Sequence, residues 1–136
     1  IDPIRSDEEI DIAGIKAEMA VAKLYQLDHD PYHFGIDSGV DLWSGETSID
    51  VKSTFHPNGH LVFKSLDAFK ADIAMLCIVQ DNVVKVTGGC EKHWFLENHV
   101  SRTFSKNKKA EFPSLTQGDL ETVDQIWSLL THARLY

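Results

Sequence analysis

Residues 71–79 contain the longest apolar run of the chain. The length of the run suits a β-strand, and the lack of polar alternation is typical of a strand that is buried on both faces. Asp81-Asn82 then predicts a turn, and alternation over residues 83–87 predicts a partner strand. Since both faces of such a strand have to be covered, the sequence predicts an α/β sandwich, in which helices flank a mixed central sheet.

The length of the chain predicts one domain, because 136 residues can bury a single sizeable core and are too few for two. We therefore expect one domain over residues 1–136. No run reaches the roughly 18 apolar residues of a membrane span, and no signal peptide opens the sequence, so we expect a soluble, cytoplasmic protein. The two cysteines, Cys77 and Cys90, lack the four-ligand spacing of a structural zinc site.

Residues 6–27 have the pattern of an amphipathic helix. Ser6 or Asp7 provides a capping side chain, and Glu8 and Glu9 place negative charge at the positive end of the helix dipole. Apolar residues then recur at helical spacing and predict one buried stripe. The members of this stripe are Ile10, Ala13, Gly14, Ala17, Val21, Leu24 and Leu27.

Glu18 lies on the border of that stripe. Gly14 and Ala17 are small, and small residues let a helix come close to a sheet. The carboxylate of Glu18 could therefore reach the edge of the sheet. The alternative is an ordinary surface glutamate in a helix that already has many acidic residues.

Residues 40–55 predict a β-hairpin. The Gly-Glu dipeptide at its centre suits a two-residue type II′ turn, which favours glycine at its first position. The residues that flank this turn then pair outward, and the fourth pair is Asp41 with Asp50. Because side chains alternate along a strand, Lys52 shares the face of Asp50.

Two carboxylates in directly opposed positions repel each other, so a positive group is expected between them. Lys52 supplies one ammonium group. Two convergent carboxylates beside a lysine also describe a site for a divalent cation, and their hard oxygen ligands suit Mg²⁺ or Mn²⁺. The alternative is an ordinary solvent-exposed face, although aspartate is disfavoured inside strands.

Shorter elements are predicted around the hairpin. Residues 32–35 predict a short strand before it, and residues 61–63 predict a third antiparallel arm after it. Residues 64–70 predict a helical turn in which Leu66 and Phe69 are packed. His56 and His60, in the intervening loop, are candidates for a group that approaches substrate or orients a water as general base.

The C-terminal part of the chain predicts two helices. The first covers residues 91–99, with Trp94, Phe95 and Leu96 as its packed side. The second follows a capping box at residues 116–119. The residues expected to face inward on this second helix are Leu120, Val123, Trp127, Leu130 and Ala133.

Asp41, eight intervening residues and then Asp50-Val51-Lys52 resemble the hairpin motif of the PD-(D/E)XK nuclease superfamily. Val40 stands where that motif has its proline, and the second acid is aspartate in place of the commoner glutamate. The resemblance covers about residues 7–87. It implies a restriction endonuclease-like αβββαβ core, to which this chain adds a C-terminal helix.

The resemblance implies a metal-dependent endonuclease that hydrolyses the phosphodiester bonds of DNA. Asp41, Asp50 and the carbonyl of Val51 would then hold one or two Mg²⁺ or Mn²⁺ ions. Glu18 matches the glutamate that the preceding helix contributes in many members, and it would complete the ligand set or hold a water. Lys52 would position this water or stabilise charge on the phosphorane. Two alternatives keep the scaffold: a catalytically inactive binding or assembly module, and a nuclease that acts on RNA.

Charge is unevenly distributed along a chain whose net charge is −8. Residues 1–50 carry 3 basic and 12 acidic groups, whereas residues 51–112 carry 9 basic and 6 acidic groups. One segment, residues 101–109, is basic without an acid, and it is either an ordinary solvated loop or a surface that contacts DNA phosphates. The candidate residues are Arg102, Lys106, Lys108 and Lys109. A homodimer is a further expectation from the resemblance, since small nucleases often use two copies to cut both strands.

Overall fold

The computed structural model describes residues 5–29, 39–105 and 109–135, the last of these with side chains only to residue 131. In these ranges the chain forms a mixed α/β structure with three α-helices, which are α1 (Asp7–Tyr25), α2 (Lys92–Asn98) and α3 (Val123–Leu135). None of the helices in these ranges is long and apolar enough to cross a membrane.

The main sheet has four strands, in the order β1-β2-β4-β5. These strands are β1 (Leu42–Ser44), β2 (Thr47–Thr54), β4 (Ile73–Gln80) and β5 (Val83–Glu91). Strand β4 is parallel to β2 and antiparallel to β5, so the prediction of a mixed sheet is confirmed. Every residue of β4 except the last is buried, as the apolar run predicted.

A second sheet has three strands, in the order β3-β7-β6, formed by β3 (Leu61–Val62), β6 (Val100–Arg102) and β7 (Phe112–Leu115). The prediction that residues 61–63 form a third arm of the hairpin is therefore wrong. The edge of β2 away from β1 is taken by β4, and β3 pairs with β7 instead. The strand predicted over residues 32–35 lies outside the described residues.

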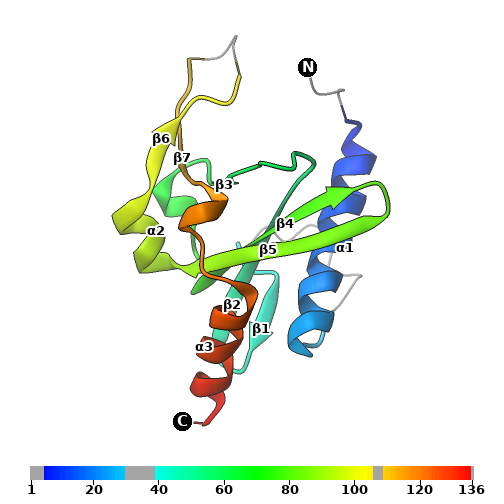
Figure 1. The fold of residues 1–136 in the computed structure, drawn as a ribbon, viewed down its shortest axis with the longest axis vertical. Helices are drawn as coiled ribbons and strands as arrows, with labels where there is room; N and C mark the ends of the chain where they lie inside the picture. Colours follow the sequence, from blue (N-terminus) through cyan, green and yellow to red (C-terminus); the bar gives the residue numbers. More distant parts are fainter. Residues whose placement is uncertain (1–4, 30–38, 106–108, 136) are drawn as a thin grey trace.

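The two faces of the main sheet have separate cores, and Figure 1 shows α1 on one side of the sheet and α2, β6 and β7 on the other. On the first side, Ile49, Met75 and Cys77 pack with buried residues of α1 and α3. On the second side, Leu76 and Cys90 pack with residues of the second sheet and of α2. Alternation along β2 therefore directs Asp50 and Lys52, the neighbours of Ala74 and Leu76, toward the second side.

Helix α1 begins as predicted but is rotated relative to the predicted stripe. Ser6 caps it, and Glu9 closes a capping box with Ser6. The buried face consists of Ala13, Ala17, Val21, Ala22 and Tyr25, whereas Ile10 and Leu24 are exposed. The large residue on this face is Tyr25, which stacks on Trp127 and donates a hydrogen bond of 2.9 Å to the carbonyl of Val123.

The packed side of α2 is narrower than the sequence predicted. Phe95 is fully buried, where its ring contacts those of Phe63 and Phe69, but Trp94 and Leu96 are exposed. Adjacent helical positions cannot all face one core, and Trp94 instead donates its indole N–H to the carbonyl of Asp119. Leu66, predicted to be packed, is likewise exposed, whereas Phe69 is buried as predicted.

The capping box of α3 lies six residues later than predicted. Thr122 and Gln125 exchange two hydrogen bonds, of 2.8 and 3.2 Å, between side chain and backbone. Thr116, in the predicted box, makes no cap bond to the backbone, and its hydroxyl instead donates to the Asp119 carboxylate. Of the residues expected inward on α3, Leu130 is buried and Val123 and Trp127 are partly buried, and the fully buried Ile126 was missed. Leu120 packs in the other core, and the side chain of Ala133 is not described.

We expect Thr122→Ala to lower the free energy of unfolding by about 1 kcal/mol, because it leaves an amide at the start of α3 without its acceptor. Thr116→Ala, the matched control, is expected to cost less than half of that. Urea unfolding of both variants measures the difference. An equal or larger loss for Thr116→Ala would place the important cap at the predicted position.

Candidate metal and phosphate site

The hairpin has the register that the sequence predicted. Leu42 pairs with Ile49, Trp43 with Ser48 and Ser44 with Thr47. Gly45 has a φ of +60° at the first position of the turn, which a type II′ turn requires and glycine adopts without strain. Asp41 directly precedes β1, so the pairing with Asp50 that the sequence predicted lies just beyond the observed pairs, and the Asp41 carboxyl group is close enough to Asp50 to raise its pKa.

At this point the backbone of β2 pairs with the side chain of Asp41 in place of a backbone group. The carboxylate oxygen Oδ2 of Asp41 accepts a hydrogen bond of 2.7 Å from the amide of Val51, and the amide of Asp41 donates to the carbonyl of Ile49 at 2.8 Å. The side chain of Asp41 is thereby held against β2. A strand residue directs its N–H and its C=O toward the same neighbour, so the carbonyl of Val51 also faces the Asp41 side.

Asp50 is a buried carboxylate, and 3 % of its surface is exposed. Burial is the largest of the effects that raise its pKa from 3.8 to about 7. The Asp41 carboxyl group also raises this pKa, whereas Lys52 lowers it. The Oδ2 atom of Asp50 accepts no hydrogen bond from the described residues. A bound cation strongly stabilises a buried carboxylate oxygen that accepts no hydrogen bond.

Lys52 lies beside Asp50 as predicted. Its Nζ is 3.4 Å from Oδ2 of Asp50, a distance for an ion pair that does not have hydrogen-bond geometry. The same ammonium lies 4.9 Å from the centre of the Phe63 ring, where the face of an aromatic ring attracts a cation. Lys52 is therefore positioned from two sides while 40 % of its side chain remains exposed.

Glu18, on α1, lies close enough to Asp41 for the two carboxyl groups to interact. Burial raises its pKa most, Asp41 raises it further, and a hydrogen bond with His29 opposes both effects. Oε2 of Glu18 lies 3.0 Å from Nε2 of His29, and the side chain of His29 is 10 % exposed. Glu18 thus interacts with the site as one alternative predicted, but in a pair with His29 that was missed.

The chain matches no protein-family model, no curated protein and no solved structure. The resemblance of the hairpin motif to the PD-(D/E)XK superfamily therefore stays a prediction. Any functional conclusion has to come from the chemistry of the site.

The types of donor at this site suit a hard divalent cation. They are the carboxylates of Asp41 and Asp50 and the Val51 carbonyl, with Glu18 nearby, and oxygen donors of this kind suit Mg²⁺ or Mn²⁺. Within the described ranges, no group of three or more histidine, cysteine, aspartate or glutamate side chains is arranged to hold a metal ion. A ligand set here would therefore depend on the backbone carbonyl, or on Glu18 leaving His29.

The residues predicted to contact DNA phosphates have different surroundings. Arg102 donates to the carbonyl and hydroxyl oxygens of Ser114, at 3.2 and 2.8 Å, so its guanidinium also joins β6 to β7. Lys109 is exposed, and Lys106 and Lys108 lie outside the described residues. Of the two histidine candidates, His60 packs edge-on against Phe104, and its pKa is lowered by burial and then by Arg102.

The cysteines take no part in this site. Cys77 and Cys90 are both buried and free. Burial raises the pKa of each thiol to about 12, so neither is a ready thiolate at neutral pH.

Proposed function

We propose that this protein is a metal-dependent phosphodiesterase that hydrolyses DNA at a site formed by Asp41, Asp50 and Lys52. The observation that carries the proposal is the state of Asp50, a buried carboxylate whose Oδ2 accepts no hydrogen bond and lies 3.4 Å from the Lys52 ammonium, with the Asp41 carboxyl group close enough to raise its pKa. Groups whose burial disfavours their own charge are concentrated at functional sites.

Each side chain of the site has a chemical role in this proposal. Asp41, Asp50 and the Val51 carbonyl would hold Mg²⁺ or Mn²⁺. The ion, when bound, supplies positive charge for the scissile phosphate and promotes attack by water. Lys52 stabilises the negative charge that builds up on the phosphate oxygens. Glu18, oriented by His29, holds a water or completes the ligand set.

We infer a restriction endonuclease-like core from the same part of the chain. The order α1, β1, β2, β4, β5, with β4 parallel to β2, supports this inference. One departure concerns the crossover from β2 to β4. It contains β3 and a single 3₁₀ turn, Leu66–Ala68, in place of an α-helix.

Isothermal titration with Mn²⁺ at pH 8, combined with a DNA cleavage assay, tests the proposal. We expect the wild-type protein to bind Mn²⁺ and cleave DNA, and Asp41→Asn to bind Mn²⁺ at least about 10-fold more weakly. Glu46→Gln, an exposed acid in the same hairpin, is the matched control and should bind like the wild type.

Each alternative gives a different result in this experiment. A protein that binds no Mn²⁺ would contradict the metal site. Binding without cleavage of DNA or RNA would identify a catalytically inactive module, and cleavage confined to RNA would identify the RNA-directed nuclease.

A further inference from the structure

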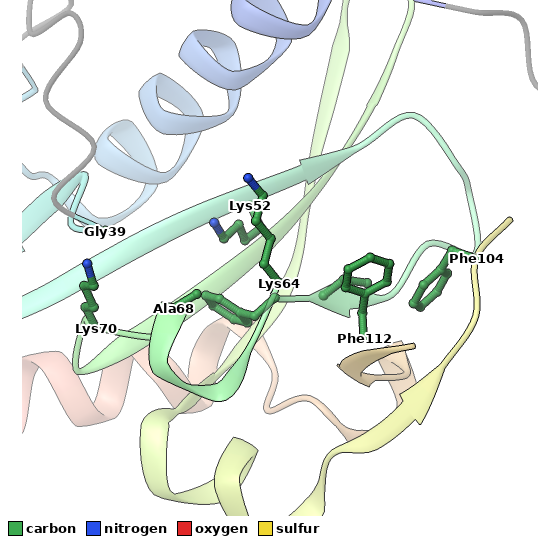
Figure 2. A pocket seen from close by; sticks show the side chains of 9 residues that line it. Gly39, Lys52, Lys64, Ala68, Lys70, Phe104 and Phe112 are labelled. Atoms are coloured by element: carbon green, nitrogen blue, oxygen red, sulfur yellow. The ribbon is translucent and has the colours of Figure 1, made fainter. Parts of the chain in front are cut away.

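A cavity of about 590 Å³ opens directly beside the candidate site. Strand β2 contributes Lys52, the segment after β3 contributes Phe63, Lys64 and Lys70, and the second sheet and the segment after β6 contribute Phe112 and Phe104. In Figure 2 the lysine ammonium groups lie toward one end of the cavity, and the rings of Phe104 and Phe112 lie at the other end. Segments that are far apart in the sequence therefore form one concave surface.

The charge of this cavity is opposite to that of the protein. The net charge of the chain is −8, yet none of the described residues that line the cavity is acidic, and three of them are lysines. A cavity of this charge selects an anion, and lysine ammonium groups at such a site are typical phosphate ligands.

The aromatic residues define the rest of the ligand. Phe104 is exposed although it is apolar, with 46 % of its surface accessible, and Phe112 is half-buried. Exposed aromatic rings beside a positively charged groove are the surfaces on which unpaired bases stack. Phosphate at one end and a base at the other is the chemistry of a nucleotide.

Lys52 connects this cavity to the proposed metal site. Its side chain lines the cavity, and its Nζ lies 3.4 Å from Oδ2 of Asp50. A phosphate next to Lys52 would therefore lie between the carboxylates and the cavity. The nucleotide adjoining that phosphate would then occupy the cavity.

We propose that this cavity binds one unpaired nucleotide of a DNA strand, so that the protein prefers single-stranded DNA or single-stranded ends over blunt duplex. This inference deepens the proposed function and rests on it for the position of the scissile phosphate. The volume falls within the range of small-molecule pockets, and a base enters such a cavity only after it has left the stacked duplex.

Binding without cleavage separates this inference from the proposed function. Fluorescence anisotropy in EDTA measures the affinity for a labelled single strand, a blunt duplex of the same sequence, and that duplex with a three-nucleotide overhang. We expect the single strand and the overhang to bind at least about 10-fold more tightly than the blunt duplex. Thymidine monophosphate as competitor distinguishes a DNA strand from a free nucleotide.

Three variants locate the interaction. Phe104→Ala is expected to lower single-strand affinity about 10-fold and leave duplex affinity unchanged, because it removes a stacking surface. Lys70→Met is expected to weaken the binding of both the single strand and the duplex, and to reduce the salt dependence of this binding. Trp43→Ala, the control, removes an aromatic ring that is 58 % exposed and does not line the cavity, and it should change neither affinity.

Equal affinity for single strand and duplex, or no effect of Phe104→Ala, would overturn the inference even if the wild-type protein cleaves DNA. Binding of thymidine monophosphate as tight as that of the oligonucleotide would also overturn it, because the ligand would then be a free nucleotide. Single-strand preference without any cleavage would support the cavity while contradicting the proposed enzyme.

Discussion

Asp50→Asn is expected to lose metal-dependent DNA cleavage by about 100-fold or more and yet, without metal, to be more stable than the wild-type protein above pH 7. Activity is lost because the amide carries no negative charge to hold the cation. Stability is gained because asparagine keeps the shape of the side chain and removes a buried charge. A gain in stability with a loss of function is typical of a site under functional strain.

The pH dependence follows from the raised pKa of Asp50. Burial and Asp41 raise this pKa from 3.8 to about 7 in the folded protein. Between about pH 4 and pH 7 the folded state therefore binds more protons than the unfolded state, and the stability of the metal-free wild type falls as the pH rises through this window. A shift of about three pKa units lowers the free energy of unfolding above pH 7 by at most about 4 kcal/mol.

Urea unfolding in EDTA at pH 4 and pH 8 measures this effect. Asp50→Asn should exceed the wild type at pH 8, and the difference should be small at pH 4, where Asp50 is protonated. Glu46→Gln is the exposed control and should show no such dependence. At pH 8, Mn²⁺ should raise the unfolding midpoint of the wild type and leave that of Asp50→Asn unchanged. A less stable Asp50→Asn at pH 8 would mean that the Asp50 charge stabilises the fold.

The sequence predicted the hairpin and its register because the determinants there are local. A glycine that suits one turn type fixes which residues pair, and the pairing at residues 42–44 and 47–49 brings the carboxyl group of Asp41, next to this ladder, close to Asp50. The central strand was predictable for a related reason, since a short uninterrupted apolar run is typical of a strand that is buried on both faces. Both predictions depended on neighbours in the sequence.

The errors arose where packing across the fold decides. The helical stripe of α1 was predicted from hydrophobicity alone, which favoured Ile10 and Leu24, but the sheet accommodates the small residues Ala13 and Ala17 and the ring of Tyr25. The predicted third arm failed because β4 already occupied the edge of β2. The periodicity of a sequence indicates that an element has an apolar face, but it does not indicate which other element packs on that face.

The missed parts of the site are those that join distant segments. His29 follows α1 and meets Glu18 across 11 residues, with no spacing that signals a functional pair. The cavity combines Lys52 of the main sheet with Phe112 of the second sheet and with Phe104, which follows β6. The basic segment was predicted from its local composition, and its contact with DNA stays a prediction, whereas its Arg102 donates a hydrogen bond to Ser114.

Lys52→Met is expected to lower DNA cleavage by about 100-fold or more while Mn²⁺ binding survives. Methionine keeps an unbranched apolar chain beside Phe63, so the packing is retained and only the charge is removed. Lys52 also lowers the pKa of Asp50, and its loss therefore shifts that pKa upward. Metal competes with a proton at Asp50, so Mn²⁺ binding by the variant should move to higher pH.

Measurements at pH 7 and pH 9 separate the two roles of Lys52. A larger fraction of Asp50 is ionised at pH 9 than at pH 7, so Mn²⁺ binding by the variant should recover at pH 9, while cleavage should stay low because the ammonium that stabilises the phosphate is missing. Lys85→Met, which removes an exposed lysine from β5, is the matched control and should behave like the wild type at both pH values. If cleavage by Lys52→Met recovered together with metal binding at pH 9, Lys52 would act only by keeping Asp50 ionised. It would then be a positioning residue for the metal site and would make no contact with the reacting phosphate.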